Sequence, residues 1–137
     1  MTQAGVHLWS QIPSLVLPKP KFLYSPVVKA GEFIFVSGLV GLDPHTGQLA
    51  EGGLIAQTRQ VLSNFRALCR EQGWSSDHLM LVRIYCTEFD RFSELNSYWD
   101  EFFKDIRPPA RTSVGVSALP LNALVEMEFQ LVATATA

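Results

Sequence analysis

Arg111 and Glu126, two charged side chains near the C-terminus, have the residue types and the settings that acid–base chemistry on a small acid requires. Arg111 follows two prolines in the segment PPARTS, Pro108 to Ser113, and proline restricts both its own backbone and that of the preceding residue. A guanidinium held in this way suits two-pronged capture of a carboxylate. A solvent-exposed arginine at the entrance of a strand is the alternative interpretation.

Glu126 lies in ALVEMEFQLVA, an apolar stretch that alternates like a strand. If its face of the sheet lies in a dry cleft, burial raises the pKa of the carboxyl and makes it a usable general base near neutral pH. An exposed polar face of an edge strand explains the same pattern. Glu128 lies two residues away on the same face, and the sequence does not rank the two carboxylates.

Two further side chains have a possible role in binding a small ligand. Tyr24, in FLYSPVV, can stack on a planar molecule or bond to it, although a strand tyrosine commonly only packs. Ser37, in FVSGLVG, can donate a hydrogen bond where Gly38 allows close approach of the backbone, or can simply form a bend.

Several kinds of site are not indicated by the sequence. The histidines at 7, 45 and 78 are far apart, and none has a second ligand at metal spacing. Cys69 and Cys86 are too few for a disulfide framework and are interpreted as core thiols. With 11 basic and 13 acidic residues, the net charge of -2 disfavours a nucleic-acid partner. We therefore expect no metal and no nucleic acid.

The predicted secondary structure places these residues in one sheet with two helices. Helical spacing of apolar residues, closed by Gly73, predicts the first helix. The predicted elements are strands over 22–28 and 32–39, a helix over 54–72, a strand over 79–86, a helix capped by Asp90 and ended by Pro108-Pro109, and strands over 112–118 and 123–132. This β-β-α-β-α-β-β order predicts an α+β fold, with one mixed sheet and both helices on one face.

Length and composition predict a single domain that associates with copies of itself. The chain of 137 residues is divided into an N-terminal arm over 1–20, which contains three prolines, and one domain over 21–137. Because 47% of the residues are hydrophobic and only 18% are charged, we expect other copies to cover the open face of the sheet. No signal peptide or membrane span is recognised, which predicts a cytoplasmic protein without a membrane partner.

From Tyr24 to Ala133 the sequence resembles the Rid family of reactive intermediate deaminases, also called the YjgF family. The resemblance is carried by SG followed by the turn DPHTG, and by PPAR followed about fifteen residues later by VEME. It implies a homotrimer with a chorismate-mutase-like fold and a site for a small carboxylate substrate in each subunit interface. It also implies hydrolysis of 2-imino acids, or of their enamine tautomers, to 2-keto acids and ammonia without metal or organic cofactor.

The same resemblance assigns roles to individual residues. Arg111 matches the family's carboxylate-binding arginine, and Glu126 matches the glutamate that orients the attacking water. Tyr24 matches the ligand-stacking tyrosine, and Ser37 the serine of the SG motif. Ser113 occupies the position of a cysteine in the well-studied deaminases, where mainly the backbone amide binds the substrate.

Two other positions differ from the common family pattern and bear on which substrate fits. Leu39 replaces a glutamine after Ser-Gly, and Asp90 replaces an asparagine near the second helix. Two alternatives to a general imine deaminase stay open. One is a pathway-specific deaminase of an aminoacrylate-like or aminomuconate-like enamine, and the other is a non-catalytic module that binds small carboxylates. The ribonuclease activity attributed to some relatives is disfavoured by the charge and by the absence of a histidine pair.

Overall fold

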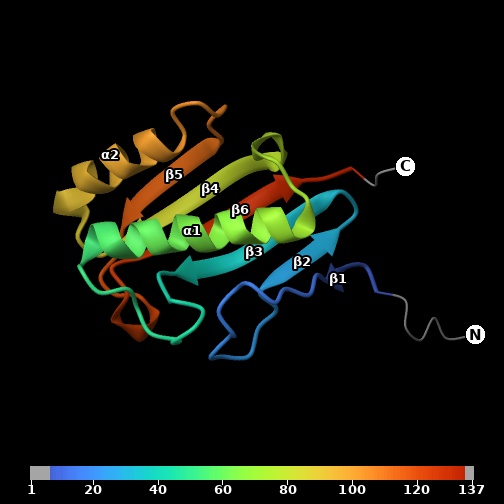
Figure 1. The fold of residues 1–137 in the computed structure, drawn as a ribbon, viewed down its shortest axis with the longest axis horizontal. Coiled ribbons are helices and arrows are strands. Elements are labelled where there is room, and N and C mark those ends of the chain that lie inside the picture. Colours follow the sequence, from blue (N-terminus) through green and yellow to red (C-terminus); the bar gives the residue numbers. More distant parts are fainter. Residues whose placement is uncertain (1–6, 135–137) are drawn as a thin grey trace, which may run out of the picture.

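One six-stranded sheet forms the centre of the computed structural model, which describes residues 7–134 (Figure 1). The strand order is β1-β2-β3-β6-β4-β5; β4 and β5 run parallel, and all other neighbours are antiparallel. The strands are β1 Ser10–Gln11, β2 Val27–Ala30, β3 Phe33–Val40, β4 Leu79–Cys86, β5 Ala110–Gly115 and β6 Val125–Val132. The predicted α+β class and the single mixed sheet are confirmed.

The helices α1, Leu54–Gln72, and α2, Phe92–Phe102, lie on the same face of this sheet (Figure 1). Helix α1 ends where Gly73 takes a left-handed backbone, with φ 75°, as predicted. Its apolar side packs on the sheet, and the rings of Phe65 and Phe129 stack with centroids 3.9 Å apart. No helix within residues 7–134 is long and apolar enough to cross a membrane.

The two faces of the sheet differ in their cover. On the helix side, β6 buries its alternate residues Val125, Met127, Phe129 and Leu131, as its pattern predicts. On the other side Phe33, Phe35 and Val114 remain 46%, 41% and 40% exposed. An aromatic and aliphatic surface therefore lies open on a single copy of the chain.

A bulge in β3 interrupts its pairing with β6. Val36 pairs with Phe129, but the next pair joins Leu39 to Met127, so that Ser37 and Gly38 fall within the register shift. A bulge bends its strand and redirects the side chains beside it. Glu126 of β6 pairs with Val40, just after the bulge, and its carboxyl group lies against Gly38.

The segment before β2 is tied to the domain at two places. Ser10 and Gln11 form β1 against β2, and Leu17 is buried in the core. Near the end of α1, Glu71 accepts hydrogen bonds from the Ser14 hydroxyl and the Leu15 backbone N–H, both at 2.7 Å. Residues 1–6 of the expected arm and 135–137 of the expected domain lie outside the described residues.

Several predicted boundaries are wrong. The strand predicted over 22–28 begins only at Val27, because the segment up to Pro26 runs as bends outside the ladder. Asp90 does not cap the second helix: it lies in a 3-10 turn, Phe89–Arg91, and Arg91 occupies the cap position. That helix also ends at Phe102, well before Pro108. Strand β5, Ala110–Gly115, begins and ends earlier than predicted, and β6, Val125–Val132, begins later.

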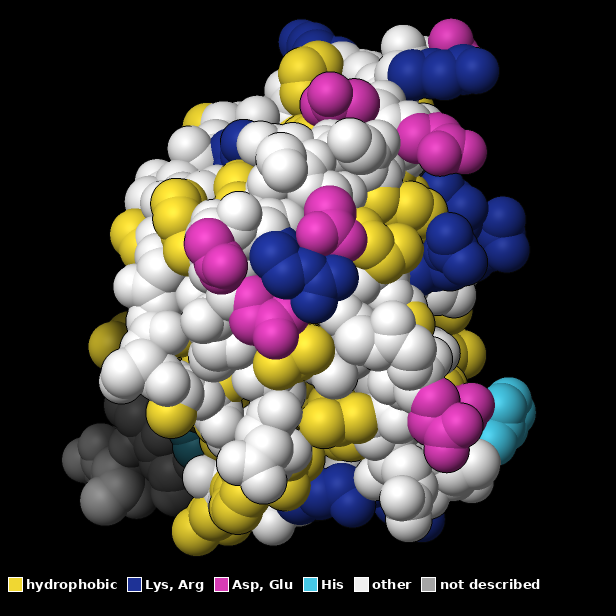
Figure 2. Space-filling model, turned by 90° about the vertical axis from the view of Figure 1, so that its left-hand side faces the viewer, with side chains coloured by type: hydrophobic (Ala, Val, Ile, Leu, Met, Phe, Trp, Pro, Cys, Tyr) yellow, Lys and Arg dark blue, Asp and Glu magenta, His cyan; other side chains and the backbone are white. Residues whose placement is uncertain are grey.

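The surface seen from the left of Figure 1 carries a mixture of side-chain types (Figure 2). Basic, acidic and hydrophobic side chains are interspersed there, and no continuous basic stripe crosses the view. Proteins that neutralise a run of phosphates present such a stripe. This face therefore lacks the charge pattern of a nucleic-acid interface.

Gln57 of α1 connects the helix to the loop before β6. Its side chain is only 7% exposed, and its carbonyl oxygen accepts the Leu124 backbone N–H at 2.8 Å. About two turns further along the helix, the Asn64 side-chain amide donates a hydrogen bond to the Leu42 carbonyl at 2.8 Å. Two buried amides thus hold the loop after β3 and the loop before β6, which lie at the same end of the bulged strand pair.

We predict that Gln57→Leu lowers the free energy of unfolding by about 1–3 kcal/mol, because the Leu124 N–H is left without its partner. Urea denaturation measures the change. The matched control is Gln60→Leu on the same helix, whose amide bonds only the Asn64 side chain. Equal effects of the two substitutions would contradict the assigned role of Gln57.

Candidate functional site

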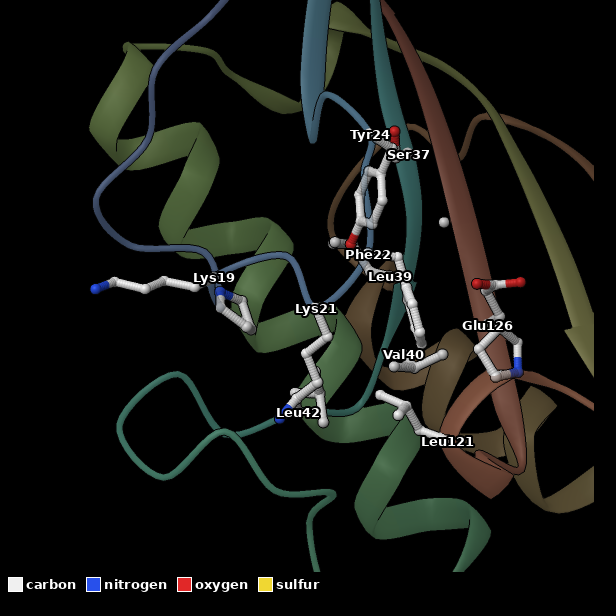
Figure 3. Close-up of a pocket in the computed structure, with 13 residues that line it drawn as sticks. Lys19, Lys21, Phe22, Tyr24, Ser37, Leu39, Val40, Leu42, Leu121 and Glu126 are labelled. Carbon is white, nitrogen blue, oxygen red and sulfur yellow. The ribbon is translucent and has the colours of Figure 1, made fainter.

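A pocket of about 290 Å³ opens beside the bulge of β3 (Figure 3). Its volume is near the lower end of the range for small-molecule sites, about 300–1,000 Å³. The segment before β2, strand β3, the loop before β6 and β6 itself supply its walls. The lining residues are Pro18, Lys19, Lys21, Phe22, Tyr24, Ser37, Gly38, Leu39, Val40, Leu42, Pro120, Leu121 and Glu126.

Glu126 is the carboxylate of this pocket. A Cβ atom added to Gly38 would lie only 2.7 Å from the carboxyl carbon and Oε2 of Glu126. Position 38 therefore admits only glycine if the carboxylate is to keep its place. Burial raises the pKa of the Glu126 carboxyl above its ordinary value, and the charge of nearby Glu128 raises it further.

Glu128 differs from Glu126 in its partners. The Tyr85 hydroxyl donates a hydrogen bond to Glu128, and Arg83 Nη1 lies 3.9 Å from its Oε1. Glu128 does not line the pocket. The two carboxylates that the strand pattern leaves unranked thus differ in position, and of the two only Glu126 lines the pocket.

Tyr24 and Ser37 line the same pocket and are linked through the backbone. The Ser37 hydroxyl donates to the Ser25 carbonyl at 2.7 Å, and the Ser37 N–H donates to the Pro26 carbonyl at 2.9 Å. These bonds fix the Tyr24 segment to the bulge, and they leave the Ser37 oxygen able only to accept a bond from a ligand. Tyr24 lies before β2 rather than in a strand; burial raises the pKa of its hydroxyl, and the charge of Glu126 adds to this.

Arg111 lies outside this pocket, on edge strand β5. Its guanidinium carbon is 5.0 Å from the centre of the Trp99 ring and 5.6 Å from that of Phe92, and Nη1 donates to Asn96 Oδ1 at 2.8 Å. All three partners belong to α2. The predicted carboxylate-binding arginine is therefore held in a defined position by the helix, with donors of its fork left for a further partner.

Ser113 lies on the same face of β5 as Arg111. It pairs with Ile84, which is fully buried beneath the helices. Its hydroxyl oxygen is buried and has no hydrogen-bond partner among residues 7–134. An unsatisfied buried hydroxyl costs about 1–3 kcal/mol, so this position is one where an apolar or thiol side chain would fit the single chain better.

The register of the sheet separates the predicted site residues into two groups. Arg111 is level with Val82 and Phe129, which face the helices. Glu126 is level with Tyr85, and Tyr85 with Val114 on the open face. Within one chain, Arg111 and Glu126 therefore point to opposite faces of the sheet. The structure brings together Tyr24, Ser37 and Glu126, but not Arg111 or Ser113.

Sequence reasoning missed the apolar wall of the pocket. Phe22 and Leu121 line it together with Val40 and Leu42. Leu121 has a positive φ of 62°, and no glycine or asparagine at that position signals such a backbone. Among residues 7–134, no group of three or more His, Cys, Asp or Glu side chains is arranged to hold a metal ion.

Comparison with known proteins gives the family. A family model described as Endoribonuclease L-PSP matches residues 16–133. The chain belongs to this family, which is also called the Rid or YjgF family. This Rid chain is 42% identical over 112 residues to a RutC family protein of Aquifex aeolicus, covering 81% of this chain and 89% of the relative.

Two further relatives of this Rid chain are a protein with a named activity and a protein with a solved structure. A protein of Dermatophagoides farinae named 2-iminobutanoate/2-iminopropanoate deaminase is 32% identical over 117 residues, which are 85% of this chain and 91% of the relative. The crystal structure of YyfA from Yersinia pestis, described as a Rid family protein of unknown function, superposes with a TM-score of 0.84. It is 34% identical, and the match covers 90% of this chain and 98% of that one.

We predict that Glu126→Gln stabilises the protein increasingly as the pH rises. Because the folded state holds the Glu126 proton more tightly than the unfolded chain, ionisation costs the folded state free energy. The advantage of the variant should grow from about pH 4.3, the ordinary carboxyl pKa, up to the raised pKa and then stay constant. Urea denaturation at several pH values measures it.

Glu128→Gln is the matched control for this prediction. It loses contacts with Tyr85 and Arg83 and removes only the smaller cause of the raised Glu126 pKa, since the burial of Glu126 remains. Its gain in stability with rising pH should therefore be smaller than that of Glu126→Gln. A difference between Glu126→Gln and wild type that does not change with pH would contradict the raised pKa of Glu126.

Proposed function

We propose that this protein hydrolyses reactive 2-imino acids, or their enamine tautomers, to 2-keto acids and ammonia. The observation that carries the proposal is the half-buried Glu126 carboxylate, with its raised pKa, in a pocket that also contains Tyr24 and Ser37. Membership of the Rid family and the name of the mite relative support imine deamination at the level of the family. The family is also described as Endoribonuclease L-PSP, but the net charge of -2 disfavours a nucleic-acid substrate.

Glu126 acts as the general base in this proposal. Its carboxylate takes a proton from a water molecule as the water oxygen attacks the electrophilic imine carbon, giving a tetrahedral carbinolamine. The proton then passes from Glu126 to the nitrogen, and the C–N bond breaks. Ammonia leaves as the carbonyl forms, and the hydroxyl proton of the carbinolamine returns to the Glu126 carboxylate. A raised pKa makes Glu126 a better acceptor of this proton than an ordinary carboxylate. A protonated imine is already electrophilic, so the step requires no metal.

Arg111 binds the substrate carboxylate in this proposal, and it comes from a second copy of the chain. Since Arg111 and Glu126 point to opposite faces of one sheet, a single chain does not close around one small acid. The open face with Phe33, Phe35 and Val114 is a surface that further copies can cover. We therefore infer a homotrimer of the chorismate-mutase-like type, with one site in each subunit interface.

Competition for a trapped imine tests the activity. An amino-acid oxidase generates 2-iminopropanoate or 2-iminobutanoate, semicarbazide traps it, and an active protein lowers the yield of semicarbazone. We expect Glu126→Gln to reduce this activity by about 10²–10⁴-fold, because general base catalysis is lost. Glu128→Gln, on the same strand face, should retain most of it.

Two outcomes would overturn the proposal. If wild type fails to compete with semicarbazide for any of several imino acids, the protein is not an imine deaminase. Calorimetric binding of a 2-keto acid that is lost in Arg111→Ala, without turnover, would then support a binding module. Activity on one enamine only would identify a pathway-specific deaminase.

Mixing two inactive variants tests whether each site is shared between copies. Arg111→Ala and Glu126→Gln chains, co-expressed with different tags, should regain activity together, because some interfaces combine an intact Arg111 with an intact Glu126. Random mixing restores about a quarter of the sites in a closed ring with shared sites. If tagged mixed assemblies form but activity does not exceed that of the separate variants, both residues act within one chain.

A further inference from the structure

Leu121 has a backbone conformation that leucine rarely adopts. Its φ and ψ are 62° and 21°, and the next residue, Asn122, has a φ of 59°. The left-handed region is unfavourable for a side chain with a Cβ, and asparagine tolerates it better than leucine does. Such conformations persist only where the surroundings impose them, and they are concentrated at functional sites.

The surroundings of Leu121 do impose this conformation. The turn begins at Pro120, and the Ala123 N–H donates to the Pro120 carbonyl at 3.1 Å. Immediately afterwards, Leu124 is bonded on both sides: its N–H donates to the buried Gln57 side chain, and its carbonyl accepts the Thr87 N–H at 3.0 Å. The end of the turn is therefore fixed to α1 and to the end of β4.

The imposed conformation places Leu121 in the wall of the pocket. The side chain remains 38% exposed, so it is not a core residue. In Figure 3 it lies near Val40, at the opposite end of the labelled group from Tyr24. Phe22, Val40 and Leu42 also line the pocket, and Figure 3 labels Val40 and Leu42 on the side of Leu121 and Tyr24 on the far side.

We propose that Leu121 determines side-chain specificity, and that the preferred substrates are 2-imino acids with a branched aliphatic or aromatic side chain. This inference rests on the proposed function of the same pocket. The reacting C=N group lies at Glu126, and the side chain of the substrate packs against Leu121, Val40 and Phe22. Leu39, which also lines the pocket, adds a further apolar contact.

An acidic substrate side chain is the competing possibility, because Lys19 and Lys21 also line the pocket. Figure 3 shows the Lys19 side chain pointing away from the other labelled residues. The Lys21 side chain extends toward Leu42 in the same view, and apolar side chains make up most of the remaining lining. The geometry therefore favours an apolar side chain, and an acidic imine belongs in the experiment as the contrasting substrate.

The experiment compares kcat/KM for imines derived from alanine, leucine, phenylalanine and glutamate. Wild type should prefer the leucine and phenylalanine imines over 2-iminopropanoate by about 10-fold or more, as apolar pockets discriminate added methylene groups. In Leu121→Gly the ratio of kcat/KM for the leucine imine to that for 2-iminopropanoate should fall about 10-fold or more. The thermal midpoint of this variant should not fall, because glycine relieves the unfavourable φ.

Asn122→Gly is the matched control, because it relieves the neighbouring positive φ without changing a residue that lines the pocket. It should leave the substrate ratio unchanged. Leu121→Ala, which keeps the strain and removes the side chain, should shift the ratio as Leu121→Gly does but lower the thermal midpoint. The pair of Leu121 variants thus separates the role of the side chain from that of the backbone.

Three results would overturn the inference. An equal loss of activity on every imine in Leu121→Gly would mean that Leu121 is only structural. A wild-type preference for the alanine imine or for the glutamate imine would reject the substrate class. If wild type hydrolyses no imine, the proposed function fails separately, and calorimetry with 4-methyl-2-oxopentanoate and pyruvate decides this inference. If wild type binds the two keto acids with the same ratio of affinities as Leu121→Gly does, the inference about Leu121 is rejected.

Discussion

The contact between Gly38 and the Glu126 carboxylate is the constraint on which the candidate site depends. The bulge of β3 brings the backbone so close that no Cβ fits between them. Burial of the carboxylate raises the pKa of Glu126. The same bulge contains Ser37, whose hydroxyl holds the Tyr24 segment. One irregularity in one strand thus positions three of the candidate residues.

The orientation of Arg111 sets the second condition for function. Helix α2 holds the guanidinium against Trp99 and Asn96, on the face of the sheet opposite to Glu126. Arg111 is level with Val82 of β4 and Glu126 with Tyr85 of the same strand. Because successive residues of a strand point to opposite faces, the two side chains cannot meet within one sheet. The chemistry we propose is therefore a property of an assembly, and the open apolar face with Phe33 and Phe35 provides a surface on which copies can pack.

Elements with a strong local pattern could be predicted from the sequence. Helix α1 and strand β4 have the predicted bounds, because a 19-residue amphipathic run ended by glycine and an eight-residue apolar run each favour one structure. The bounds of β2 and α2 were mispredicted because the residues involved lack such a pattern: Phe22 and Tyr24 suit a strand but have no pairing partner, and Asp90 suits a cap but lies in a 3-10 turn. In these two segments, tertiary contacts override the local preference of the residues for a strand or a helix cap.

The sequence by itself determined the class of fold, the alternation of β6 and the residue types of the candidate site, because these follow from hydrophobic periodicity and from motifs of fixed spacing. The alternation of β6 did not rank Glu126 and Glu128, and the family resemblance favoured Glu126. The tertiary structure puts Glu126 and not Glu128 in the pocket, since burial against Gly38 and bonding to Tyr85 depend on neighbouring strands. It alone separated Arg111 from Glu126 and brought Leu121 into the pocket. These facts arise from strand register and from a backbone angle imposed by packing, and no residue spacing encodes either of them.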